Sequence, residues 1–421
     1  MLPVIILRNT VPKSRWGVCT YLTEAHKAQK LWDERLNSKI FEKIKMEDFY
    51  FEMDRKFNRE KRGSHIDMDI FANAVTSVTQ CDPLEDLLHR FRRTPQSFKT
   101  LPSTHHAVVR AYLSLGKTEE LLRMLDDRLN FGLFLDPYST ILLLDSFLVD
   151  KNYRSAAKVA SHIMLQEEID QEFALARSMA IYGALKYALT DINDQKTIPW
   201  DPIQYSEKKE PEEEIKIRVE YLDPVYNDDH FDLIKGDDIV GKTLMFLGKN
   251  SNDDILKNSL IVLACALRGQ NIPESGPVSS CISKRLQELL EDEIFSNLKF
   301  EEFDIFQYLD QCIVQDLESL HFDLKLKELY IKWDSVRENE LRKQYDSYMR
   351  EHRLDEIGRK KKLLQEKEET LFFFDNVKKM DLLKEEKFLE WRKKLPRKSD
   401  KPIKLKPKQA VAQDYEPPKI I

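Results

Sequence analysis

Glycine is scarce in this sequence, at 11 of 421 residues, and the stretch from Val278 to Leu395 contains no proline at all. Glycine supplies most tight-turn geometries, so its scarcity beside 33% charged residues disfavours turn-rich β folds. The sequence therefore predicts an all-α protein with some very long helices near its C-terminus.

The patterns of disulfide-rich, zinc-binding and membrane-spanning proteins are also missing. The 5 cysteines lie far apart and form no CxxC pair, which indicates neither a disulfide framework nor a zinc knuckle and fits a reducing compartment. The best apolar run, Leu260 to Leu267, is too short to cross a membrane and is predicted to be a buried helix. Because the net charge is −6, any RNA contact must come from local basic patches.

What the chain does contain is a segment that repeats at a spacing of 35 residues. Moving along by that spacing places Tyr112 on Phe147 and Lys117 on Asn152. Each unit has an apolar helix, a short polar turn and a second helix with small or apolar residues. A two-helix unit cannot bury its own apolar face, so such a repeat predicts stacked neighbours in an α-solenoid. Most solenoids present binding surfaces and lack a catalytic pocket.

The C-terminal third is predicted to form a long helical hairpin, with helices over about 303–356 and 360–395 and a turn near Gly358. A seam with 4-3-4 spacing favours a coiled-coil-like contact along it. The residues of that seam are Ile313, Leu317, Leu320 and Leu324.

The N-terminus resembles a targeting segment. Residues 1–23 include Arg8, Lys13 and Arg15, and no acid precedes Glu24. This pattern is typical of a mitochondrial presequence, and a frayed N-terminus is the alternative because two prolines would interrupt its helix. The expected order along the chain is a presequence (1–23), an N-terminal helical segment (24–65), helix-pair repeats (66–190), an acidic, proline-containing linker (191–229), diverged helical repeats (230–300), the long hairpin (301–395) and a basic extended tail (396–421).

Residues 236–243 spell G-x-x-x-x-G-K-T, the pattern of a loop whose backbone N–H groups hold phosphates. However, Asp237 and Asp238 stand where the phosphate anions would lie, which is electrostatically unfavourable. Residues 245–249 are also similar to 113–117 of the repeat. We therefore interpret the string as part of the first helix of a diverged repeat, although a P-loop nucleoside triphosphatase stays open as a hypothesis.

No other pattern indicates catalysis or metal binding. His105 and His106 are the only adjacent histidines, and neither a cysteine nor an acid stands at ligand spacing from them. No Ser/His/Asp arrangement can be assembled either. We expect no catalytic residue, no metal, no cofactor and no small-molecule substrate, and hence a protein that is not an enzyme.

Basic residues gather in a few places. Arg90, Arg92 and Arg93, with Lys99 after them, end a predicted helix. Favourable interaction with the helix dipole would explain only one or two of these charges, so contact with RNA phosphates is also predicted for these four residues. Residues 359–362 are four consecutive cations, for which a solvated face is expected. The tail is richest in cations and predicts contact with RNA phosphates, a disordered solubilising tail being the alternative. The tail residues predicted to bind RNA are Arg397, Lys398, Lys401, Lys404, Lys406 and Lys408.

Residues 116–122 (Gly-Lys-Thr-Glu-Glu-Leu-Leu) and 132–136 (Gly-Leu-Phe-Leu-Asp) resemble the pentatricopeptide repeat. The region 50–190 is similar, more narrowly, to the pentatricopeptide-type proteins of the mitochondrial ribosomal small subunit. The segments that carry this similarity are residues 53–57, 89–95, 132–136, 144–147, 151–153 and 164–167. The resemblance implies a mitochondrial matrix protein without enzymatic activity, which binds small-subunit ribosomal RNA and neighbouring ribosomal proteins.

Sequence-reading pentatricopeptide proteins address a base with a polar residue early in the first helix and with the closing acid of the repeat. His106 and Asp136 occupy these positions in one repeat, but Ile141 stands at the first position in the next and cannot hydrogen-bond to a base edge. Recognition of RNA shape and phosphates is therefore favoured. Two alternatives keep the helical fold: a free factor for RNA processing or stability in mitochondria, and a helical scaffold that binds proteins alone.

Overall fold

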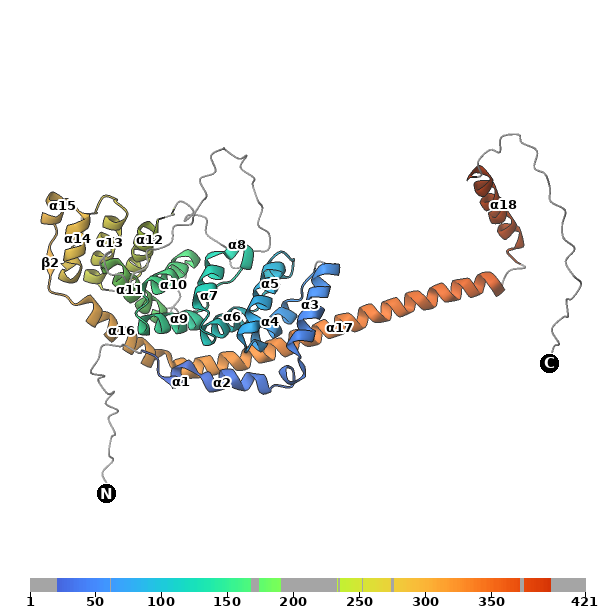
Figure 1. The fold of residues 1–421 in the computed structure, drawn as a ribbon, viewed down its shortest axis with the longest axis horizontal. Coiled ribbons are helices and arrows are strands. Elements are labelled where there is room, and N and C mark those ends of the chain that lie inside the picture. Colours follow the sequence, from blue (N-terminus) through green and yellow to red (C-terminus); the bar gives the residue numbers. More distant parts are fainter. Residues whose placement is uncertain are drawn as a thin grey trace, which may run out of the picture. The chain divides into compact units, whose positions relative to one another are not determined.

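The computed structural model describes residues 21–60, 62–167, 174–190, 233, 235–251, 253–273, 276–371 and 375–394, and these residues are almost entirely helical (Figure 1). The α-helices from α3 up to the linker are α3 (Met46–Glu60), α4 (His65–Ala74), α5 (Cys81–Arg92), α6 (Pro102–Ser114), α7 (Thr118–Asp126), α8 (Arg128–Phe131), α9 (Pro137–Val149), α10 (Tyr153–Gln166) and α11 (Ala174–Leu189). Beyond it follow α12 (Gly236–Lys249), α13 (Asp254–Leu267), α14 (Ser283–Leu289), α15 (Asp292–Ser296), α16 (Ile305–Leu320), α17 (Phe322–Leu371) and α18 (Val377–Lys394). The prediction of an all-α fold is confirmed.

The helices stack in two rows, as expected of a solenoid. An inner row is formed by α4, α6, α9 and α11, each packed on the next, and an outer row by α5, α7 with α8, α10 and α12. Consecutive helices pair across the rows, so that α9 contacts α10 and α10 contacts α11. Since each pair covers the apolar side of its neighbour, the array has one continuous core.

The turns between paired helices repeat their geometry at the spacing seen in the sequence. The backbone N–H of Lys117 donates to the carbonyl of Tyr112 (2.9 Å), and that of Asn152 donates to the carbonyl of Phe147 (2.8 Å). Each turn contains a residue with left-handed backbone, Gly116 (φ 71°) in the first and Lys151 (φ 55°) in the second. Both residues directly follow a helix C-cap (Leu115 and Asp150), at the position where a left-handed glycine is favoured.

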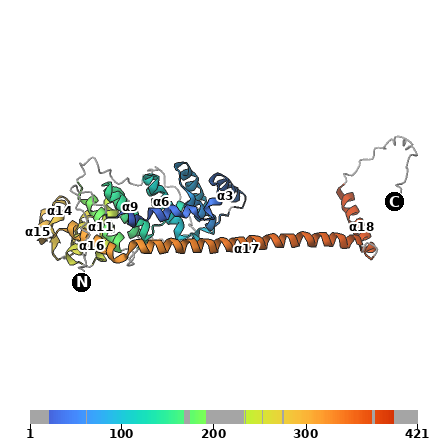
Figure 2. The same cartoon turned by 90° about the horizontal axis from the view of Figure 1, so that it is seen from below.

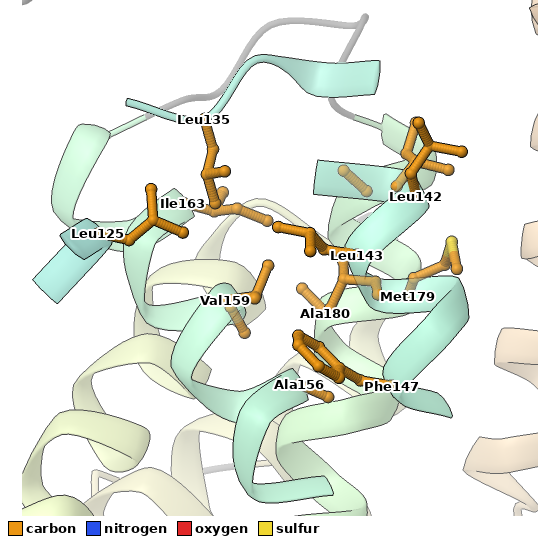
Figure 3. Packing of buried hydrophobic residues seen from close by; sticks show 14 of the residues in the cluster. Leu125, Leu135, Leu142, Leu143, Phe147, Ala156, Val159, Ile163, Met179 and Ala180 are labelled. Atoms are coloured by element: carbon orange, nitrogen blue, oxygen red, sulfur yellow. The ribbon is translucent and has the colours of Figure 1, made fainter. Parts of the chain in front are cut away.

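The core between α9, α10 and α11 is built from large and small side chains in alternation. Figure 3 shows the ring of Phe147 beside Ala156, with Ala180 of α11 close by. Gly183 lies so close to α10 that an added Cβ would stand 2.8 Å from the Cβ of Ala156. Helices can approach this closely only where residues as small as glycine and alanine face each other. Removal of a buried ring such as Phe147 would cost about 3–5 kcal/mol.

After α13 the chain forms two short strands and then turns back. Strands β1 (Val278–Ser279) and β2 (Phe300–Glu301) pair in parallel, and α16 packs against α11. From there the first part of α17 runs along the inner row (Figures 1 and 2).

The hairpin turn predicted near Gly358 is wrong, because α17 is a single helix of 50 residues that continues through this position. A glycine inside a helix costs only about 1 kcal/mol relative to alanine, and strong helix formers flank it on both sides. The predicted seam is also interrupted, since His321 takes a left-handed conformation between α16 and α17 and Leu324 is exposed. Ile313 and Leu317 instead belong to the core of the array.

The N-terminal segment is divided into several short elements. It comprises α1 (Glu24–Lys27), α2 (Gln29–Glu34), the short 3₁₀ turns η1 (Arg35–Asn37) and η2 (Phe41–Lys43), and then α3. The left-handed backbone of Ala28 (φ 46°) separates α1 from α2. Just before α1, the backbone N–H groups of Tyr21 and Leu22 both donate to the Asp145 carboxylate of α9, at 3.1 Å each. Most of the predicted presequence, like the predicted linker over 191–229, lies outside the described residues.

The chain divides into two units, residues 1–342 and 343–421, with the boundary inside α17. The first contains the helix pairs, the N-terminal segment and the first turns of α17. Within the described part of the second, every side chain of α18 is at least partly exposed to solvent. None of the helices among the described residues combines the length and hydrophobicity needed to cross a membrane.

Candidate nucleic-acid interface

The basic residues predicted at the end of α5 lie in different environments. Arg90 donates to the carboxylates of Asp54 (2.5 Å) and Asp86 (3.0 Å), so its charge is compensated within the chain. The hydrogen bond to Asp54 is the main reason that the pKa of Arg90 is raised. Arg92 is buried, which lowers its pKa, and its side chain lies against Gly132. Both residues therefore serve the packing of the array.

Arg93 and Lys99, in contrast, are exposed. Arg93 donates to the imidazole of His89 at 3.1 Å, which leaves its positive charge uncompensated by that contact. Lys99 stands 5.8 Å from the ring centre of Phe98, which is itself half exposed. A cation beside an exposed ring is a combination that can meet both phosphates and unstacked bases of RNA.

Folding places a further cation beside them. An added Cβ at Gly63 would collide with Phe57 of α3 (2.6 Å) and Phe91 of α5 (2.9 Å), so the loop after α3 lies against the end of α5. The ring of His65 is within 2.9 Å of the Gln96 side chain in the loop after α5. These two loops therefore lie side by side, and the exposed Arg62 belongs to the first of them. We call Arg62, Arg93 and Lys99 the basic edge.

The two residues at base-reading positions contact each other. Nδ1 of His106 lies 3.3 Å from the carboxylate oxygens of Asp136, and its Nε2 lies 3.1 Å from the hydroxyl of Tyr330 in α17. The His106 ring is completely buried, with the indole of Trp333 at 5.0 Å between ring centres. Both ring nitrogens thus have partners within the chain, and a base edge is not among the groups that His106 can reach in this arrangement.

Asp136 has a structural task at the same time. Its carboxylate accepts from the backbone N–H of Ser139 (3.2 Å) and caps the N-terminus of α9. Burial pushes the pKa of Asp136 upward, but the nearby His106 and the hydrogen bonds of Ser139 outweigh it and the pKa is lowered. The carboxylate is therefore held in its charged form by two neighbouring helices.

The cover over this pair is the first part of α17, which follows the inner row. Its inward residues recur at a spacing of three or four: Phe322, Leu326, Tyr330, Trp333, Arg337 and Leu341. In chain order, the contacts are Phe322 with Tyr138 of α9, Tyr330 with His106 of α6, and Arg337 with Asp69 of α4. The surface on which a sequence-reading solenoid would receive bases is thus occupied by the chain itself. Sequence reasoning missed this contact, although the spacing of the inward residues was a signal for it.

The string that matches a phosphate-binding loop is helical. Residues 236–243 form the first turns of α12, and the backbone N–H of Ile239 already donates to the carbonyl of Lys235 (3.1 Å). Gly241 serves helix packing, because an added Cβ would stand 2.7 Å from the side chain of Arg268, the C-cap of α13. The hypothesis of a P-loop enzyme is contradicted by this geometry, since no loop with free N–H groups is formed.

The other predicted features are distributed as follows. Residues 359–362 are exposed on α17, in accordance with a solvated face. Among the described residues, no group of histidine, cysteine, aspartate and glutamate side chains could hold a metal ion. The tail cations Arg397, Lys398, Lys401, Lys404, Lys406 and Lys408 lie outside the described residues, so their contact with RNA stays a prediction.

Comparison with known families gives one match that covers most of the chain. The family model of mitochondrial 28S ribosomal protein S27 matches residues 4–327. The matched region contains the N-terminal segment, both rows of helices, α16 and the first turns of α17.

Proposed function

The chain belongs to the family of mitochondrial 28S ribosomal protein S27 and is therefore a mitochondrial protein of the small ribosomal subunit, and from this premise we propose that it is a structural, RNA-binding component in the matrix. It holds ribosomal RNA through phosphates and contacts neighbouring ribosomal proteins in mitochondrial translation. We also propose that its helix pairs are pentatricopeptide repeats that no longer read bases. Neither role requires a catalytic group.

The observation that carries the proposal is the basic edge. Arg62, Arg93 and Lys99 are exposed on two loops that pack against each other. Two acids near these loops are engaged elsewhere: Asp67 pairs with Lys56 (2.9 Å) and Glu340 with His65 (3.6 Å). Exposed, uncompensated cations of this kind bind phosphates independently of sequence and release counterions on binding.

The filled inner row supports phosphate recognition over base reading. With His106 bonded to Asp136 and Tyr330, the residues that would form a base code are used for packing. The tail cations from Arg397 to Lys408 would extend the contact with RNA. A free factor that selects its RNA by sequence is accordingly disfavoured by the same observation.

Charge reversal tests the RNA contact. Mitochondrial small subunits that carry the variant Arg62→Glu/Arg93→Glu/Lys99→Glu should show a roughly tenfold or larger loss of crosslinking between this protein and ribosomal RNA after ultraviolet irradiation. Arg123→Glu is the matched control, because Arg123 is similarly exposed but pairs with Glu85 (2.8 Å) away from these loops. Equal crosslinking in the triple variant and in the control would contradict an RNA contact at the basic edge.

Sucrose-gradient sedimentation of mitochondrial lysate tests the structural role. A structural component should co-migrate with the small subunit in a fixed ratio to other subunit proteins. Free migration of most of the protein would instead support a soluble RNA factor. If ribonuclease treatment leaves all of its protein partners attached, the scaffold that binds proteins alone would be favoured.

A further inference from the structure

A groove of about 420 Å³ lies between the N-terminal segment and α17. One wall is formed by α2, η1 and the residue that follows, and the other by α17 between Lys327 and Arg337. Asn73 of α4 also lines it. The groove belongs entirely to the first unit and is separate from the basic edge, because none of its lining residues lies in the two loops of that edge.

Arg35 provides a partly buried positive charge in this groove, which the carboxylate of Asp33 offsets only in part. Its Nε donates to the backbone carbonyl of Asn73 (3.0 Å), its Nη1 donates to the carbonyl of Trp32, and its guanidinium lies 3.6 Å from the centre of the Trp32 ring. These partners are neutral, and within the described part of the chain no carboxylate forms an ion pair with Arg35. Burial of this charge lowers the pKa of Arg35 to about 10. A carboxylate of another molecule would offset the free-energy cost of burying this charge.

A hydroxyl in the same groove also lacks a partner. The Oγ atom of Ser38 is buried, and among the described residues it makes no hydrogen bond. A buried hydroxyl without a partner is unfavourable and is usually explained by a group that completes it. On the opposite wall, Lys327 is exposed and adds a further donor. A guanidinium, a hydroxyl and an ammonium group around one groove are all donors for a carboxylate.

The rest of the groove favours a protein segment over RNA. Ile331 on its rim is 70% exposed, and Leu31 is half-buried. Glu34 and Asp334 also line the groove and would repel a phosphate backbone. A single carboxylate meets less of this repulsion than a continuous chain of phosphates, and the charge of Asp334 is partly offset by its ion pair with Arg337.

We propose that this groove receives a short segment of a neighbouring ribosomal protein in which an aspartate or glutamate stands beside a large aliphatic or aromatic residue. The carboxylate accepts hydrogen bonds from Arg35 and Ser38, and the apolar side chain covers Ile331 and Leu31. The inference rests on the proposed function only for the source of the segment, a protein of the same ribosomal subunit.

Photocrosslinking in assembled small subunits tests the inference. A photoreactive benzoylphenylalanine in place of Ile331 should crosslink to a protein, and mass spectrometry should find an acidic residue beside a large apolar residue in the crosslinked peptide. In the Arg35→Gln variant the yield should fall roughly tenfold or more, as when one partner of a buried charge pair is lost. Lys327→Glu, which places a like charge near the bound carboxylate, should lower the yield as well. Lys327 is exposed, so its substitution tests the groove without disturbing the core.

The control is the same photoreactive group in place of Val314, an exposed residue of α16 away from the groove, whose crosslinks should not change with Lys327→Glu. A crosslink from position 331 to RNA, a crosslinked peptide without a carboxylate, or a yield unchanged in both variants would overturn the inference. Ultraviolet crosslinking of the basic edge to RNA is measured in the same particles. Loss of that signal alone would contradict the proposed RNA contact and leave the groove unaffected.

Discussion

Arg337 of α17 donates to Asp69 of α4 across 2.6 Å, and the two side chains are only 4% and 0% exposed. Asp69 also accepts from the hydroxyls of Ser103 (2.5 Å) and Thr104 (2.9 Å) at the start of α6. One buried carboxylate therefore joins two inner helices to the helix that covers them. An ion pair of this kind is sensitive to the loss of either partner, because the remaining charge stays buried.

Replacement of Arg337 alone should be strongly destabilising. In Arg337→Met the Asp69 carboxylate loses its cation, and the free energy of unfolding should fall by about 3–5 kcal/mol in urea titrations. The double variant Asp69→Leu/Arg337→Met should recover part of this loss, since no charge is left unpaired. Glu338→Gln, at the exposed neighbouring position, serves as the control. A change below about 0.5 kcal/mol in Arg337→Met would be inconsistent with a buried pair.

Loss of the Tyr330 hydroxyl should lower the stability of the protein without weakening the proposed RNA contact at the basic edge. This oxygen contacts Nε2 of His106 (3.1 Å) and accepts from Arg110 (2.9 Å), so Tyr330→Phe should lower the free energy of unfolding by about 1–3 kcal/mol. Tyr348→Phe, on the exposed part of α17, should have no effect. If Tyr330→Phe reduced crosslinking to RNA at unchanged stability, the inner row would be an RNA surface after all.

The two equivalent turns make opposite predictions. Gly116→Ala introduces a Cβ at a left-handed position with open space around it, so only backbone strain changes, and stability should fall by about 1 kcal/mol. Lys151→Gly removes such strain from the next turn and should stabilise the protein by a similar amount. Thermal unfolding of both variants measures the difference. The same direction of change in both would contradict the shared turn geometry.

Protonation of a buried histidine should make stability depend on pH. Burial lowers the pKa of His162, although the Asp126 carboxylate 3.4 Å away opposes this, and Arg128 and Lys158 add to the lowering. The unfolded chain takes up this proton near pH 6.5, whereas the folded chain does so only at lower pH. The contribution of neutral, buried His162 to the free energy of unfolding is therefore fully present above about pH 6.5 and is lost as the pH falls below that value. Urea titrations between about pH 7.5 and 5 should show this fall, and His162→Gln should reduce it.

The helix pairs were predictable from the sequence because local signals and the long-range pattern agree. Tyr112 and Phe147 occupy equivalent buried positions, and the turns after them share one hydrogen-bond pattern. The 35-residue spacing reports this directly, since every pair must repeat the shape of its neighbour in order to cover it. The interpretation of residues 236–243 as part of a helix and the buried helix predicted at Leu260 to Leu267 are also confirmed, since these residues lie in α12 and α13.

The candidate site was harder to predict, because exposure depends on which helices meet. Arg90, Arg92 and Arg93 are neighbours in sequence, yet folding pairs the first with acids, buries the second and exposes the third. Arg62 joins Lys99 only through the packing of two loops that are far apart in sequence. His106 is polar, as a base reader would be, but its partner Tyr330 is contributed by a helix more than half the chain away.

Because α17 touches α9, α6 and α4 in succession, the distances between these helices are set by a single stiff rod. In a solenoid of stacked helix pairs, the pairs ordinarily shift relative to one another when the solenoid binds a ligand. With α17 packed along the inner row, such shifts of the helix pairs would have to break a buried ion pair, the contacts around Tyr330 and an aromatic contact at once. A particle assembled around this protein would thus receive a unit in which the spacing of these inner helices is held constant.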